Sequence, residues 1–226
     1  MGLRLAAALL AVFTPAAAHA QAERDEQVWT SVNVIASVSP QVDLMGEAHA
    51  RYFDGASRLG QLLLRPSVTY KLPRGFSVTG GYVYVRNRPR GGRATDEHRS
   101  WEQVGYVFAR NADGPLVVGR TRVEQRFRPD ADGVGWRLRQ FVRAQLPIRA
   151  GSPVRVVVWN ESFFGLNDTR WGQRGGTDQI RTFVGAALPV AKGVTVEPGY
   201  FNQTVFRVGR DRVNHAVAAH LFIRLP

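Results

Sequence analysis

Charged side chains recur at every second position between Gly119 and Pro129. The segment reads G-R-T-R-V-E-Q-R-F-R-P, so four arginines and Glu124 share one parity. Successive side chains of a β-strand point to opposite faces, whereas a helix would scatter these charges around its circumference. The segment is therefore predicted to be a strand that has one ladder of charges and one less polar face.

This ladder fits two kinds of β protein. A soluble sandwich would pack the less polar face into a core and leave the arginines in water. A membrane barrel would turn the less polar face toward lipid and enclose the arginines in a polar lumen. The remaining features of the sequence have to decide between the two.

The N-terminus predicts export. Arg4 is followed by the short apolar run Leu5–Phe13 and then by Ala18-His19-Ala20, which together form a signal peptide with its cleavage site. Residues 1–20 are therefore predicted to be a cleaved signal peptide and residues 21–226 a single mature domain. No later apolar run reaches the roughly 20 residues that a membrane-spanning helix needs. The chain has no cysteine, which excludes disulfides and thiolate chemistry.

The positive charge comes almost entirely from arginine. The formal net charge is +12, and Lys71 and Lys192 are the only lysines. Proteins that bind nucleic acid gather basic residues on one surface. Here the arginines alternate along strands beside Glu and Gln, which indicates an internal pairing network, so no nucleic-acid partner is expected. The guanidinium group suits such a network because it stays charged and pairs carboxylates through two hydrogen bonds.

Strand-like alternation continues through the mature chain, with turns at short intervals. Short connections are predicted at 73–75, 111–115, 150–153 and 189–193, and long ones at 88–96, 129–135 and 165–176. Outer-membrane barrels alternate short periplasmic turns with longer outside loops in this way. About eleven strands can be counted, and we expect ten or twelve because bacterial barrels have even numbers. Aromatic residues at strand ends would suit the membrane interfaces: Tyr52, Tyr70, Phe76, Phe108, Phe127, Trp136 and Tyr200.

A set of short motifs resembles a known family, the domain of unknown function 2490. The motifs follow one another in order over nearly the whole mature chain: Trp29, Arg65-Pro66 with Tyr70, Gly81-Tyr82-Val83-Tyr84, Glu97-His98-Arg99 with Trp101 and Gln103, Arg120-x-Arg122-x-Glu124-x-Arg126, Arg137-x-Arg139, Asn160-Glu161-x-Phe163, Gln179-x-Arg181 and Gly199-Tyr200. The resemblance implies a barrel like those of the outer membrane. It implies no catalytic residues, because the family has no assigned activity.

Twelve polar residues are predicted to line the lumen: Arg99, Gln103, Arg120, Arg122, Glu124, Arg126, Arg137, Arg139, Arg143, Glu161, Gln179 and Arg181. One interpretation is structural, because side chains fill the lumen of a small barrel and ion pairs would hold its strands in register. The other is a narrow anion-selective pore, since arginine outnumbers carboxylate and arginine rings favour anions.

A lipid hydrolase at the barrel rim is a further alternative. It would need a serine, a histidine and an acid or amide on adjacent strands. The candidates are Ser100, Ser162, His49, His98, His215 and His220. No Gly-x-Ser-x-Gly elbow is present. Glu124 and Glu161 are two carboxylates suited to glycoside hydrolysis, but the surrounding arginines would keep either from holding the proton that a general acid needs. No His/Asp/Glu spacing is typical of a metal site.

The sequence thus predicts an all-β protein, a single antiparallel transmembrane β-barrel of ten to twelve strands in the cell outer membrane of a Gram-negative bacterium. It would have no enzymatic activity and no cofactor. Its expected surroundings are outer-membrane lipid and lipopolysaccharide, with small anions as candidate ligands. A soluble periplasmic β-sandwich that binds polyanions is the last alternative.

Overall fold

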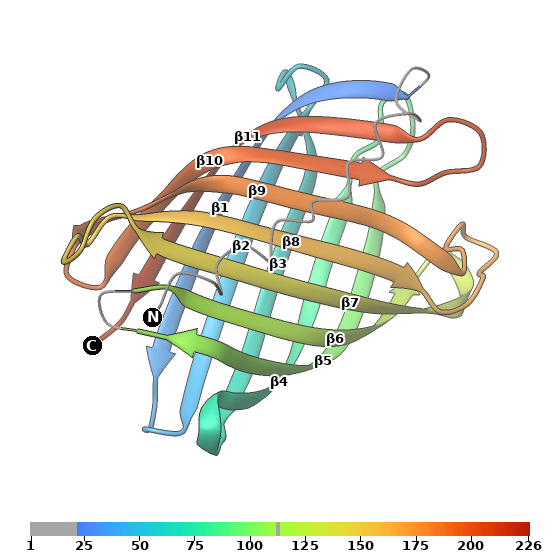
Figure 1. The fold of residues 1–226 in the computed structure, drawn as a ribbon. Helices are drawn as coiled ribbons and strands as arrows, with labels where there is room; N and C mark the ends of the chain where they lie inside the picture. Colours follow the sequence, from blue (N-terminus) through green and yellow to red (C-terminus); the bar gives the residue numbers. More distant parts are fainter. Residues whose placement is uncertain (1–21, 112–113) are drawn as a thin grey trace.

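The computed structural model describes residues 22–111 and 114–226, so the predicted signal peptide lies outside the described residues. The described chain forms one closed β-barrel (Figure 1). The strands are β1 (Glu23–Ser37), β2 (Val42–Phe53), β3 (Arg58–Lys71), β4 (Phe76–Asn87), β5 (Thr95–Arg110), β6 (Leu116–Arg128), β7 (Ala131–Pro147), β8 (Arg155–Gly165), β9 (Gly176–Ala191), β10 (Val194–Val205) and β11 (Arg212–Arg224). The all-β barrel predicted from the alternation is confirmed.

The barrel closes between its first and last strands. β1 pairs with β11 in parallel, with Glu23 opposite Arg212 and Ile35 opposite Arg224, whereas all other neighbouring strands are antiparallel. An up-and-down chain with eleven strands must close in this way, because its first and last strands run in the same direction. The expectation of an even strand number was therefore wrong.

Connections gather at two ends of the barrel. The turn end carries residues 38–41, 72–75, 111, 114–115, 148–154 and 192–193, and the loop end carries 54–57, 88–94, 129–130, 166–175 and 206–211. The loop end lies at the upper right of Figure 1 and the turn end at the lower left. The predicted long loop 129–135 was wrong: β7 begins at Ala131, which is paired with Arg128 of β6, and only two residues connect the strands.

The one helical turn among the described residues is Pro73–Gly75, at the turn end. Arg74 adopts a left-handed backbone conformation there (φ 60°), and Gly75 also has a positive φ of 80°. No helix in residues 22–111 or 114–226 is long and apolar enough to cross a membrane.

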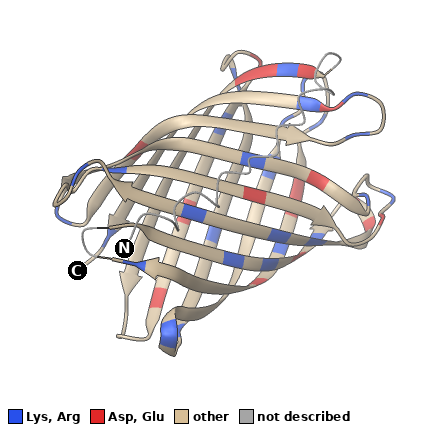
Figure 2. Cartoon of the chain, viewed as in Figure 1, with Lys and Arg blue, Asp and Glu red and all other residues tan. Residues whose placement is uncertain are grey.

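The two faces of the sheet differ in chemistry. Large apolar side chains point outward from most strands, among them Leu44, Leu64, Val104 and Val184, each at least 42% exposed. Most charged residues of the middle strands, such as Arg122 and Glu124, belong to the inner face, and charged positions are coloured along the strands in Figure 2. An eight-stranded barrel is just wide enough for its side chains to fill it, and the diameter grows with strand number. The wider lumen of eleven strands therefore needs the longest side chains, arginine and the aromatic residues.

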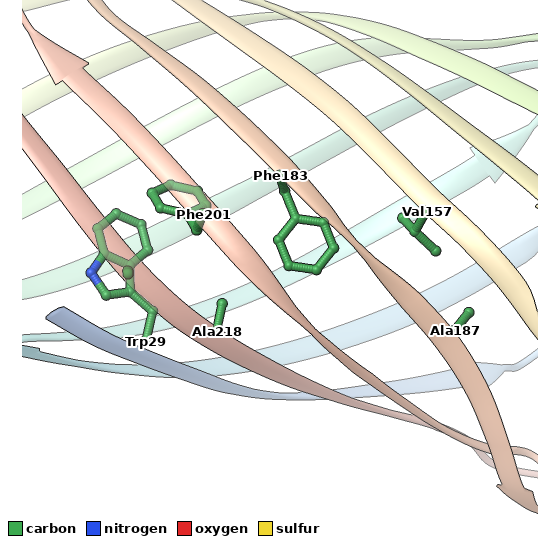
Figure 3. Packing of buried hydrophobic residues seen from close by; sticks show 7 residues of the cluster. Trp29, Val157, Phe183, Ala187, Phe201 and Ala218 are labelled. Atoms are coloured by element: carbon green, nitrogen blue, oxygen red, sulfur yellow. The ribbon is translucent and has the colours of Figure 1, made fainter. Parts of the chain in front are cut away.

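An aromatic cluster fills part of the lumen on the side of β1 and β8–β11. Trp29, Phe183 and Phe201 are at most 5% exposed and pack with Val157, Ala187, Ala216 and Ala218 (Figure 3). The Trp29 and Phe201 ring centroids lie 4.2 Å apart, and Trp159 stacks on Phe183 at 5.4 Å. Opposite them, Leu63, Val83, Val85 and Trp101 form a smaller cluster. The loop-side part of the inner face of β4 is thus apolar, whereas Thr79 is buried nearer the turn end.

Candidate functional site: the arginine-rich lumen

Glu124 lies at the centre of the lumen and is fully buried. Arg137 of the next strand donates two hydrogen bonds to its Oε2 atom, at 3.0 and 2.6 Å, and Arg139 donates to its Oε1 atom. Arg122 Nη1 lies 3.7 Å from the carboxylate and Arg99 Nη1 lies 4.0 Å from it. One carboxylate is therefore shared by four guanidinium groups from strands β5, β6 and β7.

Ion pairs extend from Glu124 in two directions. Arg99 also donates to Glu97, at 2.7 Å, so that it joins the two glutamates on the loop side. Arg139 donates to Glu161 of β8 at 2.6 Å and joins it to Glu124. Carboxylate and guanidinium groups therefore alternate across four neighbouring strands.

Two further arginines attach to the ends of this row. Arg120 Nη2 donates to Glu161 at 3.0 Å, and Arg181 Nη1 lies 4.0 Å from the same carboxylate. Arg126 donates to both oxygens of Glu97, at 2.5 and 3.1 Å. Because Glu97 and Glu161 are at most 4% exposed, their hydrogen bonds must compensate for lost hydration, and removal of one partner is costly.

All twelve residues predicted for the lumen lie on the inner face. Gln103 accepts two hydrogen bonds from Arg122, at 3.1 and 2.8 Å, and Gln179 accepts one from Arg181 at 3.1 Å. Arg143 is separate from the others, because it lies closer to the turn end and pairs with Glu197 of β10.

In the central part of the described lumen, without the pairs at its mouths such as Arg212–Asp25, arginine outnumbers glutamate two to one. The five glutamates are Glu47, Glu97, Glu124, Glu161 and Glu197, and the ten arginines are Arg51, Arg65, Arg99, Arg120, Arg122, Arg126, Arg137, Arg139, Arg143 and Arg181.

Aromatic rings compensate part of this surplus of positive charge. The guanidinium carbon of Arg122 lies 3.6 Å from the Trp101 ring centroid, and that of Arg51 lies 3.8 Å from the Trp29 centroid. The negative faces of aromatic rings attract cations, more strongly where water is excluded. The Trp29 and Trp101 rings therefore stabilise guanidinium groups that have no carboxylate of their own.

Several lumen residues were missed from the sequence. Glu47 of β2 pairs with Arg65 of β3 at 2.5 Å, and Arg51 donates to Gln61 at 2.6 Å. These charged positions share a parity with the inward residues of their strands, a signal that was present in the sequence. Gln173 carried no such signal, because it belongs to the loop 166–175 and folds back to accept a hydrogen bond from Arg126 at 3.1 Å.

Two cavities enter the lumen from opposite ends. A cavity of about 300 Å³ on the loop side is lined by Trp29, Arg51, Arg181 and other inward residues, which come from all eleven strands. A cavity of about 410 Å³ at the turn end is lined by Arg143, Ala187 and their neighbours, and the two share no lining residue. Trp29 and Ala187 both belong to the aromatic cluster, so this cluster lies between the two cavities.

The hydrolase candidates are divided between the faces. His49 and His220 point inward, where they contact Glu47 Oε2 (2.9 Å) and Ser31 Oγ (2.8 Å). His215 points outward, with its Nδ1 atom 2.5 Å from the Tyr200 hydroxyl, and Ser162 donates to Asn160 on the same strand.

One candidate pair was overlooked in the sequence. His98-Arg99-Ser100 is a His-x-Ser pair, and both outer residues lie on the outward face of β5. The two side chains have different partners: His98 Nδ1 contacts the Tyr82 hydroxyl, and Ser100 donates to Gln125 Oε1 at 2.7 Å. Within the described residues, no group of three His, Asp or Glu side chains is placed to hold a metal ion.

A family model described as "Protein of unknown function (DUF2490)" matches residues 26–214, which include all twelve residues predicted for the lumen. The chain belongs to the DUF2490 family. The resemblance predicted from the ordered motifs is thus confirmed. An uncharacterized protein of Methylorubrum extorquens is similar to this DUF2490 chain, with 35% identity over 222 residues that cover 97% of this chain and 96% of the relative.

Among solved structures, the siderophore receptor PirA from Pseudomonas aeruginosa aligns with 81% of this DUF2490 chain. The TM-score is 0.29 and the sequence identity 11%, and the aligned region is 38% of the receptor chain. This chain therefore spans well under half the length of the receptor, and a likeness at this level does not establish a common fold.

Proposed function

We propose that this DUF2490 protein is a non-enzymatic barrel of the outer membrane whose lumen is closed by its ion pairs and its aromatic cluster. The outward apolar face supports the membrane location, since lipid-facing positions of such barrels alternate with polar lumen positions. The aromatic residues expected at the interfaces point outward and are 37–62% exposed: Tyr52, Tyr70, Phe76, Phe108, Phe127, Trp136 and Tyr200.

Several polar groups on the outward face satisfy one another, which makes them compatible with lipid. Thr121 donates to Gln140 at 2.7 Å, and Gln140 donates to the Tyr106 hydroxyl at 2.5 Å. In the hydrocarbon region water is not available to bond such groups, so internal pairs must replace it. In this orientation the loop end would face outside and the turn end the periplasm.

The observation that best supports a closed lumen is the complete burial of Glu124 among four arginines. The aromatic cluster lies on the turn-end side of the loop-side cavity and adds a second barrier. The two end cavities have no lining residue in common. We therefore favour the structural role of the network over the anion-selective pore. The single closed sheet also argues against the soluble sandwich, which needs two packed sheets.

The membrane location is tested by outer-membrane fractionation, followed by electrophoresis in detergent of boiled and unboiled protein. We expect recovery in the outer membrane and a mobility shift on boiling, because a closed barrel stays folded in detergent until it is heated. A soluble periplasmic protein without a shift would contradict the membrane location.

Conductance tests the closed lumen. Purified protein in planar bilayers is expected to give no stable single-channel steps at moderate voltage, because the arginine network and the aromatic cluster block the path. Regular anion-selective steps from the wild-type protein would instead establish the pore.

Lipid turnover tests the absence of enzymatic activity. Neither wild-type protein nor Ser100→Ala should release fatty acid from phospholipid or lipopolysaccharide, because the Ser100 hydroxyl donates to Gln125 rather than to a histidine. Mass spectrometry of the extracted lipid after incubation measures this. Release by wild type that Ser100→Ala abolishes would make His98 and Ser100 catalytic and overturn the proposal.

A further inference from the structure

The cavity on the loop side is strongly positive. We call it the vestibule, and it is the space of about 300 Å³ that has Trp29, Arg51, Leu63 and Arg181 in its wall. Nine arginines line it, against two acidic residues, Glu97 and Asp178. A cavity of about 600 Å³ under the loop 166–175 shares Glu97, Arg126 and Asp178 with it and leads to the loop end. The vestibule is thus accessible from one end and closed below by the aromatic cluster.

The vestibule also contains guanidinium groups whose charge is poorly compensated. Arg51 is 8% exposed and makes no ion pair within the described chain. Its Nη1 atom donates to Gln61, but its Nε atom is buried without a hydrogen-bond partner. Arg65, also 8% exposed, has a buried Nε atom without a partner as well. Buried donors are almost always satisfied, so each such atom indicates a missing partner.

Arg181 lies close to the same point. Its guanidinium carbon is 5.4 Å from the Trp29 centroid, over which Arg51 also lies at 3.8 Å. Its nearest carboxylate, that of Glu161, is 4.0 Å away and is already bound by Arg139 and Arg120. Two guanidinium groups from opposite parts of the wall thus meet beside one indole ring, with little negative charge between them.

We propose that the vestibule binds a small soluble anion carrying two or more negative charges on phosphate or carboxylate groups, held by Arg51 and Arg181 with Arg65 behind them. The fork of arginine matches both groups bidentately, and a charge-assisted bond to these guanidinium groups would supply the negative charge that they lack. Lipid headgroups are excluded as the source, because strands on all sides separate the vestibule from the outward face. The anion would enter from the loop end, where arginines of the mouth raise its local concentration.

This inference deepens the proposed function but does not need the lumen to be closed, because a pore would contain the same arginines. Binding is therefore measured by calorimetry in detergent, with pyrophosphate and citrate as separate probes and chloride at the same ionic strength as the reference. We expect saturable binding of one anion per barrel for at least one probe. Arg51→Gln and Arg181→Gln should each weaken it at least tenfold.

The matched control is Arg149→Gln, which removes the same charge from an exposed turn-end position. We expect it to bind like wild type. Both vestibule variants remove surplus positive charge rather than a carboxylate, so they should keep the heat-dependent mobility shift. Absence of saturable binding with both probes, or equal weakening in Arg149→Gln, would overturn the proposal. If wild-type protein gives channel steps but still binds the anion through Arg51 and Arg181, only the proposal of a closed lumen is overturned.

Discussion

Replacing Glu124 with alanine is expected to lower the free energy of unfolding by about 3–5 kcal/mol, the range for breaking a buried ion pair on one side. The carboxylate is fully buried and is approached by four arginines, two of which donate hydrogen bonds to it. Without it, Arg137 would keep only its contact with Asp178 at 3.1 Å, and Arg139 only its bonds to Glu161. Unfolding in urea, followed by tryptophan fluorescence and by the mobility shift, measures the loss.

The control for this prediction is Glu102→Ala. Glu102 lies one strand away on the outward face and accepts a single hydrogen bond from Gln125, at 2.9 Å. We expect it to change the free energy of unfolding by less than about 1 kcal/mol. The variant Glu124→Gln removes the negative charge but keeps the shape of the side chain. It should be destabilised as well, because a neutral amide cannot compensate the positive charge of several arginines. If Glu124→Ala unfolds at the same urea concentration as wild type, the ladder must be hydrated and the lumen open to water.

The part of the fold that depends on local alternation could be predicted from the sequence. The charged parity of Gly119–Pro129 predicts a strand with one charged face, and β6 spans Leu116–Arg128 with Arg122 and Glu124 on one face and buried. The prediction succeeds because the period of two is a property of the backbone and needs no knowledge of the neighbouring strands.

The closure of the barrel could not be predicted in the same way. Whether β1 meets β11 in parallel depends on the whole chain, and no short segment encodes it. The start of β7 was missed for a local reason. Asp132, Gly133 and Gly135 have the composition of a loop, but backbone pairing with β6 extends the hairpin to Ala131. Hydrogen bonds to the partner strand outweigh weak local preference here.

The lumen was predicted as a set of residues but not as a set of pairs. Arg120 of β6 pairs with Glu161 of β8, and Arg143 of β7 pairs with Glu197 of β10. These pairs skip one or more strands, so they depend on the curvature of the closed sheet and on the length of the arginine side chain. Parity identifies which residues face inward, whereas the partner of each is fixed only by closure.

Removing the rings between the two cavities is expected to make the barrel conduct. Phe183 and Phe201 are at most 1% exposed, and both lie in the cluster whose members Trp29 and Ala187 reach the vestibule and the turn-end cavity. Phe183→Ala/Phe201→Ala should connect the two cavities and give single-channel steps in planar bilayers where wild type gives none. Anions should carry the current, because arginine outnumbers glutamate along the path.

The same double variant should also be less stable. Loss of a buried phenylalanine costs about 3–5 kcal/mol, and the two losses need not add because both rings pack against Trp159. Phe201→Ala alone is the milder variant if the double variant fails to fold. The matched control is Phe108→Ala/Phe127→Ala, which removes two outward rings that are 62% and 41% exposed and should leave the bilayer silent. Single-channel steps from this control would mean that any destabilised barrel conducts ions, whichever rings are removed. A folded Phe183→Ala/Phe201→Ala protein without steps would place the barrier in the arginine network itself, where Glu124 joins strands β5 to β7.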